Sequence, residues 1–417
     1  MFRNLYTTGA RSMQTTPVTF NTGANIPAAE LDQRISALQL RIAKRGIDGA
    51  LILQNADLYY FAGTIQQAHL YIPAEGEPLL LVKKSIHRAA AESGIQQIVA
   101  MGSLKQLPDL IQQAGKPLPQ KLGMELDVLP VNLYRKYKEV FADGDMVDIS
   151  HDIRMVRAVK SPFEIDLIRQ AAERMDRVAS QFITELKPGI AEVELAGKME
   201  AIARRLGHQG MVRMRLWGSE MFYGHLMAGA SAAIPSYLAS PTGGKALSPA
   251  FAQGAGFHKI APHEPVLFDY VFAFRGYLAD HTRIFSIGPL AKDLMAAHQA
   301  MIDLQEFLAK EMIPGRMAGD IYEMALAKAH EAGYQDFFMG AEKERIRFVG
   351  HGIGLELDEY PFLAQGQRLR LQKNMVIALE PKLVFPGKGV VGIENTHVVG
   401  DNGLERLTHY PDEITVG

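Results

Sequence analysis

The chain has 417 residues, of which 47% are hydrophobic and 22% are charged, and its formal net charge is −2. This is ordinary globular composition, and the length is too great for one compact core, so we expect two or three domains. The balanced charge gives no reason to expect a nucleic acid or an anionic membrane as a partner. Because the chain has no cysteine, disulfides, thiolate metal sites and thiol nucleophiles are excluded, and any metal must be bound by oxygen and imidazole.

Residues 1–26 are expected to form a disordered leader. The first 29 residues are rich in Thr and Asn, and they contain Arg3 and Arg11 but no acidic residue. They lack the apolar segment of a secretory signal, and no apolar run in the chain reaches the ~18 residues of a membrane helix. We therefore expect a protein of the cytoplasm.

Residues 27–158 are predicted to form a small α/β domain. The stretch "AELDQRISALQLRIAKRG" places Leu31, Ile35, Leu38 and Ile42 on one helical face and ends at Gly46. The stretches "GALIL" and "KLGMEL" are typical of short buried strands, and "LYIPAEGEPLLLV" predicts a hairpin. Nothing in this region has a catalytic pattern.

Residues 159–417 are predicted to form a second domain. Ser161, Pro162 and Glu164 form the capping box of a long helix that ends at Pro188-Gly189, and "AEVELAGKMEAIARRLG" predicts another helix. From Met211 the pattern changes to strands and glycine-rich loops. Two further helices are expected at about 291–312 and 318–332, before a closing β region.

Two acidic residues stand within the apolar stretch "VLFDYVFAFRGYLADHTRIF". If this stretch is a hairpin that turns at Phe274-Arg275, Asp269 and Asp280 face each other across it. Like charges about 5 Å apart on one sheet surface destabilise the pair. Strand alternation puts Leu267 and Val271 on the same surface, so the acids are enclosed and require a cation.

The same pattern recurs near the C-terminus, where Glu380 and Glu394 are symmetric about Gly387 in "MVIALEPKLVFPGKGVVGIENTHVV". His351 follows Gly350 in "FVGHGIGLELDEYP", where glycines leave the backbone open to a ligand. Taken singly, such residues are more often strand-edge acids or a turn histidine. Together, four enclosed carboxylates and one imidazole suit two bridged divalent ions ~3.5–4 Å apart.

These residues resemble the pita-bread metallopeptidases, a family that includes methionine aminopeptidase, aminopeptidase P, prolidase and the non-peptidase creatinase. The resemblance covers residues of about 155–417, and the preceding region is similar to the creatinase-type N-terminal domain. It rests on Asp269 and Asp280 with Thr282-Arg283, "GHGIGLE", Glu380-Pro381 and Glu394. It implies an α/β creatinase-like domain followed by an α+β pita-bread catalytic domain, and commonly a homodimer.

The resemblance also implies a role for each ligand. Asp269 would bind one metal ion and His351 and Glu380 the other, while Asp280 and Glu394 would bridge the two. In the peptidases of this family a metal-bound hydroxide attacks the scissile carbonyl, and the counterpart of Glu380 assists proton transfer. The ions expected are two divalent ions of Mn, Fe, Co or Zn, since four carboxylates and one imidazole suit any of them.

The accessory residues depart from the family pattern. Ser236 stands in place of a usual histidine after Pro235, Arg347 and Asp358 replace two further histidines, and Gly392 replaces an arginine. Besides Glu380, we take Asp358 and Arg347 as catalytic candidates that form a rebuilt charge pair. Ser236 and His225 are the substrate-binding candidates. His225, His281 and His397 could each supply a substitute imidazole, and the methionine-rich stretch around His225 fits core packing better than a pocket wall.

Three functions follow from this pattern. The first is an Xaa-Pro aminopeptidase- or prolidase-like hydrolase that acts on a small peptide. The second is another reaction on the same scaffold, either creatinase-like C–N hydrolysis or a metal-assisted lyase reaction. The third is a metal-binding protein without turnover, because lost transition-state donors can each cost on the order of 100-fold in rate.

Overall fold

The computed structural model describes residues 25–341 and 343–417. The leader expected over residues 1–26 lies outside the described residues up to residue 24. Residues 25 and 26 belong to the fold, because the Asn25 side chain donates to the Ala91 carbonyl at 2.8 Å and Ile26 is buried. In the described part of the chain, none of the helices is both long and apolar enough to span a bilayer.

The N-terminal part is an α/β body around a six-stranded sheet of order β4-β3-β2-β1-β5-β6. β2 is antiparallel to β1 and β3, and the remaining pairs are parallel. The strands are β1 (Gly49–Ile52), β2 (Ala68–Pro73), β3 (Leu79–Val82), β4 (Ile98–Ala100), β5 (Lys121–Met124) and β6 (Asp145–Asp148). The helices are α1 (Ala28–Lys44), α2 (Asn55–Ala62), α3 (Ile86–Glu92), the 3-10 turn η1 (Leu104–Gln106), α4 (Leu107–Gln113) and α5 (Val131–Val140).

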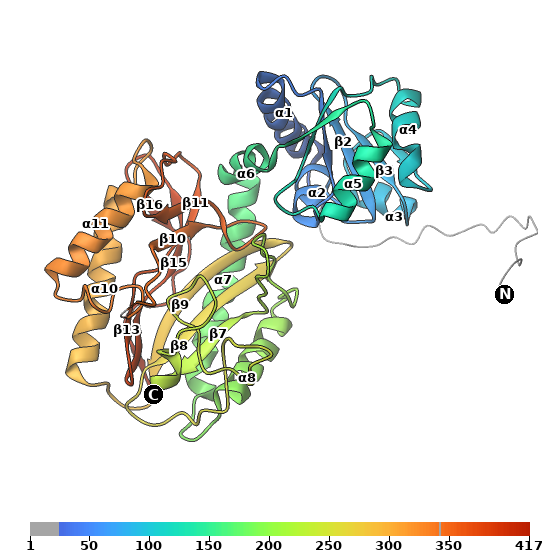
Figure 1. Ribbon diagram of the computed structural model, residues 1–417. Helices are drawn as coiled ribbons and strands as arrows, with labels where there is room; N and C mark the ends of the chain where they lie inside the picture. The colour runs from blue at the N-terminus through green and yellow to red at the C-terminus, as the bar shows by residue number, and fades with distance from the viewer. Residues whose placement is uncertain (1–24, 342) are drawn as a thin grey trace, which may run out of the picture.

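Helix α6 (Ser150–Ala158) leads from this body into the larger C-terminal part (Figure 1). There α7 (Pro162–Glu185) begins with the predicted capping box, in which Glu164 N–H donates to Ser161 Oγ at 3.2 Å and Ser161 N–H donates to Glu164 Oε2 at 3.0 Å. The other helices are α8 (Glu192–Arg205), α9 (Gly229–Ala232), α10 (Lys292–Glu311) and α11 (Ala318–Glu331). The predicted helices therefore form, while the division of the chain at residues 158 and 159 stays a prediction.

Three sheets fill the space between these helices, with α7 and α8 on one side and α10 and α11 on the other (Figure 1). Their orders are β17-β9-β8-β7, β11-β10-β12-β15-β16 and β13-β14. The strands are β7 (Gly224–Ala228), β8 (Val266–Phe274), β9 (Tyr277–Ser286), β10 (Phe348–Gly352), β11 (Glu359–Ala364), β12 (Val376–Leu379), β13 (Lys382–Phe385), β14 (Gly389–Gly392), β15 (Asn395–Val399), β16 (Leu404–Arg406) and β17 (Thr415–Val416). This is the mixed helix-and-sheet catalytic architecture that the resemblance implied.

A buried ionic network joins the two parts of the chain. The Arg157 guanidinium of α6 lies 2.6 Å from Asp57 of α2 and 2.7 Å from Glu356. Arg215 bridges the same Asp57 at 2.7 Å and Asp127 at 2.7 Å. Removing one partner from such a buried network leaves an uncompensated charge, which is costly. The network therefore fixes the N-terminal body against the loops that surround the candidate site.

In the loop after α8, the His208 ring accepts one hydrogen bond and donates another, which matches its neutral form. Its Nδ1 accepts from Gly210 N–H at 2.9 Å, and its Nε2 lies 3.1 Å from the Val271 carbonyl. Burial, aided by the nearby Arg204 guanidinium, lowers the pKa of His208 to about 4, although the Val271 carbonyl opposes the shift. Because the unfolded chain binds this proton near pH 6.5, His208 contributes stability that is complete above pH 6.5 and is lost as the pH falls toward 4.

We predict that His208→Gln reduces the pH dependence of stability. Between pH 7 and pH 5, the wild-type chain should lose about 2 kcal/mol more unfolding free energy than the variant, from one proton at about 1.4 kcal/mol per pH unit. Urea unfolding of both proteins in chelator at the two pH values measures this difference. Equal losses would show that His208 does not titrate as its hydrogen bonds require.

Candidate metal centre

The first pair of acids shares a sheet face, but its predicted register is wrong. Asp269 pairs with Thr282, and Asp280 pairs with Val271, so the two carboxylates are diagonal neighbours and not directly opposite. The turn lies at Arg275-Gly276, both of which have positive φ, at 51° and 89°. A two-residue turn of this kind matches the twist of the strands. The shift of two residues keeps both acids on the same surface.

The second pair lies opposite, as predicted. Leu379 pairs with Asn395 on one side, Lys382 pairs with Gly392 on the other, and one register runs through both ladders. Glu380 and Glu394 therefore face each other at the break between them. Glu394 also exchanges two backbone hydrogen bonds with Thr282 of β9, at 3.2 and 3.3 Å. This bridge brings the second pair of acids against the first.

His351 reaches the acids from β10, between β11 and β12. The glycines on either side allow the three strands to approach, because a Cβ at Gly350 would lie 2.5 Å from the Ala378 carbonyl oxygen and one at Gly352 would lie 2.2 Å from the Tyr360 carbonyl oxygen. His351 Nδ1 is 3.1 Å from the Gly352 carbonyl oxygen, so Nδ1 carries a proton, and Nε2 is the ring nitrogen that lies near Glu380 and Glu394. The sequence analysis expected these glycines to leave the backbone open to a ligand, whereas the structure shows that they make room for the neighbouring strands.

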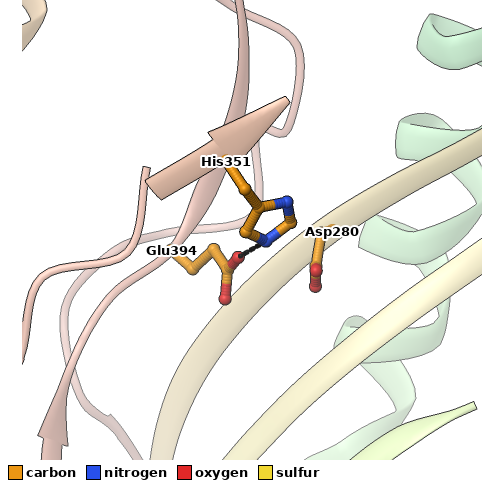
Figure 2. A group of neighbouring side chains, drawn as sticks. All are labelled: Asp280, His351 and Glu394. Carbon is orange, nitrogen blue, oxygen red and sulfur yellow. Dashed lines mark ion pairs between the residues drawn. The ribbon is translucent and has the colours of Figure 1, made fainter. Parts of the chain in front are cut away.

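Asp280, His351 and Glu394 converge on one point (Figure 2). One ligand atom from each lies within 4.8 Å of the others, and His351 Nε2 is 3.9 Å from Glu394 Oε1. Among the described residues, neither Asp280 Oδ1 nor Glu394 Oε1 has a hydrogen-bond partner, although both atoms are buried. Unpaired buried carboxylate oxygens are costly. A bound cation would supply the missing partner of both oxygens.

Lys382 is part of the same cluster, and our sequence analysis missed it. Its Nζ lies 2.8 Å from Glu380 Oε2, 2.9 Å from Glu394 Oε2 and 3.1 Å from Asp269 Oδ2. The side chain is only 1% exposed. Strand alternation carries the signal that could have found it, since a residue two positions after Glu380 lies on the same face as Glu380.

The acids act to raise the pKa of Lys382, and Lys382 acts to lower the pKa of the acids. Burial, together with the neighbouring Glu394 and Asp269, raises the pKa of Asp280 well above its usual range. Burial likewise raises the pKa of Glu394 to about 7, although Lys382 opposes this shift. For Lys382, burial acts to lower the pKa, but Asp269, Glu380 and Glu394 outweigh it and hold the pKa well above its usual range. The cluster still favours further positive charge.

These residues fit a divalent cation at one position. Asp280, Glu394 and His351 offer oxygen and imidazole donors of the kind that Mn, Fe, Co and Zn accept. At the second position, between Asp269, Glu380 and Glu394, the space is already filled by the Lys382 ammonium. The expectation that five residues hold two ions stays a prediction. Lys382 matters for it because its ammonium contacts three of the four acids expected to bind those ions.

A cavity of about 380 Å³ opens onto the cluster. Apolar side chains such as Met214, Val271 and Leu357 form part of its wall, and Trp217, fully exposed, lies at its rim. The methionine-rich stretch therefore lines a pocket in part, although we preferred core packing for it. A cavity of this size, with apolar side chains beside a cluster of charged groups, is typical of a small-molecule site.

Two of the four accessory candidates line this cavity. Asp358 Oδ1 lies 3.8 Å from His351 Nδ1. His225 pairs with Asp269 across β7 and β8, and its Nε2 is 3.1 Å from Gln253 Oε1. Burial lowers the pKa of His225, although Asp269 opposes the shift, so its neutral form is favoured.

The structure does not bring Arg347 or Ser236 to the cluster. The Arg347 side chain is exposed, and among the described residues it makes no ion pair with Asp358. Ser236 borders a neighbouring hollow, where its hydroxyl donates to the Ala252 carbonyl. His281 and His397 are buried elsewhere, against Asp176 and the Asn395 carbonyl. None of these four residues lines the cavity.

Comparison with known proteins agrees with this architecture. The sequence model of the family "Metallopeptidase family M24" matches residues 166–401, and that of the "Creatinase/Prolidase N-terminal domain" matches residues 34–159. An uncharacterized peptidase of Bacillus subtilis is 27% identical over 92% of this chain and 99% of its own, and an Xaa-Pro dipeptidase of Pyrococcus furiosus is 25% identical over 92% and 100%.

Solved structures show the same fold. An Xaa-Pro dipeptidase from Bacillus anthracis superposes with a TM-score of 0.79 at 23% identity, covering 93% of this chain and 99% of that one. The prolidase from Pyrococcus horikoshii gives 0.76 at 24% identity, covering 91% and 99%. The expected family and the expected pair of folds, creatinase-like and pita-bread, are thereby confirmed.

We predict that Gly352→Ala damages both the fold and the centre. The added Cβ would collide with the Tyr360 carbonyl, so β11 must shift, at a cost of about 1–3 kcal/mol, and His351 shifts with it. Urea unfolding and Mn²⁺ titration measure the two effects. Gly197→Ala is the matched control, because a Cβ there has nothing within 4 Å in the middle of α8, and it should stabilise by about 1 kcal/mol.

Unchanged stability and metal affinity in Gly352→Ala would contradict the requirement for close strand approach beside His351. Equal losses in both glycine variants would show that the effect is not specific to β10.

Proposed function

The chain belongs to metallopeptidase family M24, a family of hydrolases, and on this premise we propose that it cleaves the amide bond of a small peptide of the Xaa-Pro type with the help of a bound divalent metal. The observation that carries the proposal is the meeting of Asp280, His351 and Glu394 at the floor of the cavity, with two buried carboxylate oxygens unpaired. The Xaa-Pro dipeptidases among the relatives support the choice of substrate.

A divalent ion, when bound, would lower the pKa of a water molecule and polarise the carbonyl of the substrate. The residues of the chain do the rest. Glu380 Oε1 lies 3.8 Å from His351 Nε2 at the cavity wall and is the carboxylate placed to accept and return a proton. Lys382 engages the other oxygen, Oε2, and so holds the Glu380 carboxylate in one orientation.

Two residues beside the cluster position the groups that react. Asp358, close to Nδ1 of His351, favours the ring orientation in which Nε2 points to the acids. His225 is buried, burial lowers its pKa, and it offers a polar group in the wall of the cavity. Both fit a role in orienting a small substrate. Mn, Fe, Co or Zn remain the proposed metals, and the cytoplasm and a homodimer remain the proposed location and state.

A non-peptidase reaction on the same scaffold is the second candidate. The observation that favours it is the position of Arg347 and Ser236, because neither supplies a donor to the cavity in place of the histidines usual in the family. Creatinase-like C–N hydrolysis or a lyase reaction on a small compound needs fewer peptide contacts. A metal-binding protein without turnover is the remaining alternative.

We predict that Asp280→Ala or Glu394→Ala removes bound metal and activity together. Loss of a ligand from this centre should lower kcat/KM at least about 100-fold, as for the loss of a key transition-state contact. The measurement is proline release from Xaa-Pro dipeptides by protein reconstituted with Mn²⁺, Fe²⁺, Co²⁺ or Zn²⁺, beside elemental analysis. Asp293→Ala, which breaks an exposed pair with Lys388, is the control and should leave both unchanged.

Full activity in either ligand variant would contradict the proposed centre. Silence of the wild-type protein toward Xaa-Pro peptides, with turnover of small amides or amidino compounds, would favour the second candidate. Metal binding without any turnover would favour the third.

A further inference from the structure

We propose that the Lys382 ammonium permanently replaces one of the two metal ions expected for this centre, which therefore binds a single divalent cation between Asp280, His351 and Glu394. The inference rests on the proposed metal centre but not on the proposed substrate. It makes the centre a mixed one, in which one positive charge belongs to the chain and the other is acquired from solution.

The contacts of Lys382 account for every proton of its ammonium. The three acceptors are oxygens of Asp269, Glu380 and Glu394, at 3.1, 2.8 and 2.9 Å from Nζ. An ammonium has three donors and no acceptor, so these contacts satisfy it completely. The acceptors come from β8, from the end of β12 and from the segment between β14 and β15. Lys382 thus gathers the same segments that a metal ion would gather.

The space at this position does not admit an ion as well. Metal–carboxylate bonds are about 2.0–2.2 Å long, so an ion bound to those three oxygens would share all of its protein ligands with Nζ and lie beside it. Two cations at that separation repel strongly in a buried place. The ammonium and an ion at this position therefore exclude each other.

The remaining donors form a separate position. Glu394 directs Oε2 to Lys382 and to the Thr282 hydroxyl, at 2.9 Å in each case, and leaves Oε1 unpaired. Asp280 Oδ1 is also unpaired, and both side chains are almost fully buried. With His351 Nε2 they provide three donors on the far side of Glu394. Glu394 would then bridge an ammonium and an ion, as a bridging carboxylate joins two ions.

The charges of the cluster agree with one ion. The four carboxylates of Asp269, Asp280, Glu380 and Glu394 face the single positive charge of Lys382. One divalent ion reduces the imbalance to a single negative charge. Two divalent ions together with Lys382 would exceed the charge of the four carboxylates, so Lys382 removes the need for a second ion to neutralise them.

Gly392 allows the backbone that carries Lys382 to pass close to β14. It lies directly opposite Lys382 in the β13–β14 pair and has a φ of 144°. A Cβ there would approach within 2.6 Å of Lys382 Cα and 2.5 Å of the Pro381 carbonyl oxygen. A side chain at position 392, where the family usually has an arginine, is therefore incompatible with the present path of Lys382.

The number of Mn²⁺ ions bound per chain tests the proposal. Full-length protein is stripped with a chelator, titrated with Mn²⁺ in a calorimeter, and analysed for metal and by electron paramagnetic resonance. We expect one ion in the wild type, with the spectrum of an isolated Mn²⁺. Asp269→Asn should retain this ion, because Asp269 contacts Lys382 and not the free donors, whereas Asp280→Asn should lose it.

Lys382→Ala should bind a second ion at high Mn²⁺ and show the spectrum of a coupled pair. The matched control is Lys160→Ala, which removes another buried lysine, paired with Glu359 at 2.9 Å and outside the cluster, and should still bind one ion. If Lys382→Ala does not fold, the wild type and the two aspartate variants decide the question.

Two ions in the wild type, none in the wild type, or loss of the ion in Asp269→Asn would each overturn the proposal. The outcome is independent of substrate. One bound ion without proline release would refute the proposed peptidase function alone, and two ions with proline release would refute this inference alone.

Discussion

Four carboxylates converge in one buried place, and the positive charge that they require governs the rest of the centre. Asp269 and Asp280 come from one hairpin, and Glu380 and Glu394 from another, and the Thr282–Glu394 bridge joins the two. Ionised groups of like sign are not tolerated at this depth unless cations neutralise them. Lys382 supplies one such charge from within the chain. The strand pairing that brings the acids together therefore also requires a positive charge between them.

Strand alternation and turn symmetry predicted which acids meet in the centre, but they gave the correct register for only one of the two hairpins. The Glu380–Glu394 pair was correct because the turn is centred on Gly387, whose φ of 76° suits a glycine. The Asp269–Asp280 register was wrong because Arg275 adopts a positive φ, which is uncommon for a residue with a side chain. Both acids stayed on the predicted face, since an error of two residues preserves alternation.

Residues outside the strands could not be placed from sequence. Arg347 and Ser236 occupy positions where the family has histidines, but loops carry each of them away from the cavity, and no periodicity describes a loop. Lys382 was missed for a different reason. A lysine in a strand is usually solvated, and its inward direction follows only when Glu380, two residues before it, is already known to face the centre.

An ammonium and a metal ion both neutralise carboxylates, but they differ in whether they can also bind a substrate. A metal ion has coordination positions that a substrate oxygen can enter, whereas the donors of Lys382 are all committed to carboxylates of the chain. Lys382 therefore stabilises the arrangement of the acids without binding substrate. Under the proposed function, orientation of a substrate would depend on the remaining cavity groups, chiefly His225, Asp358 and the apolar side chains. Because charged and apolar side chains line the same cavity, both charge and shape would select a small molecule there.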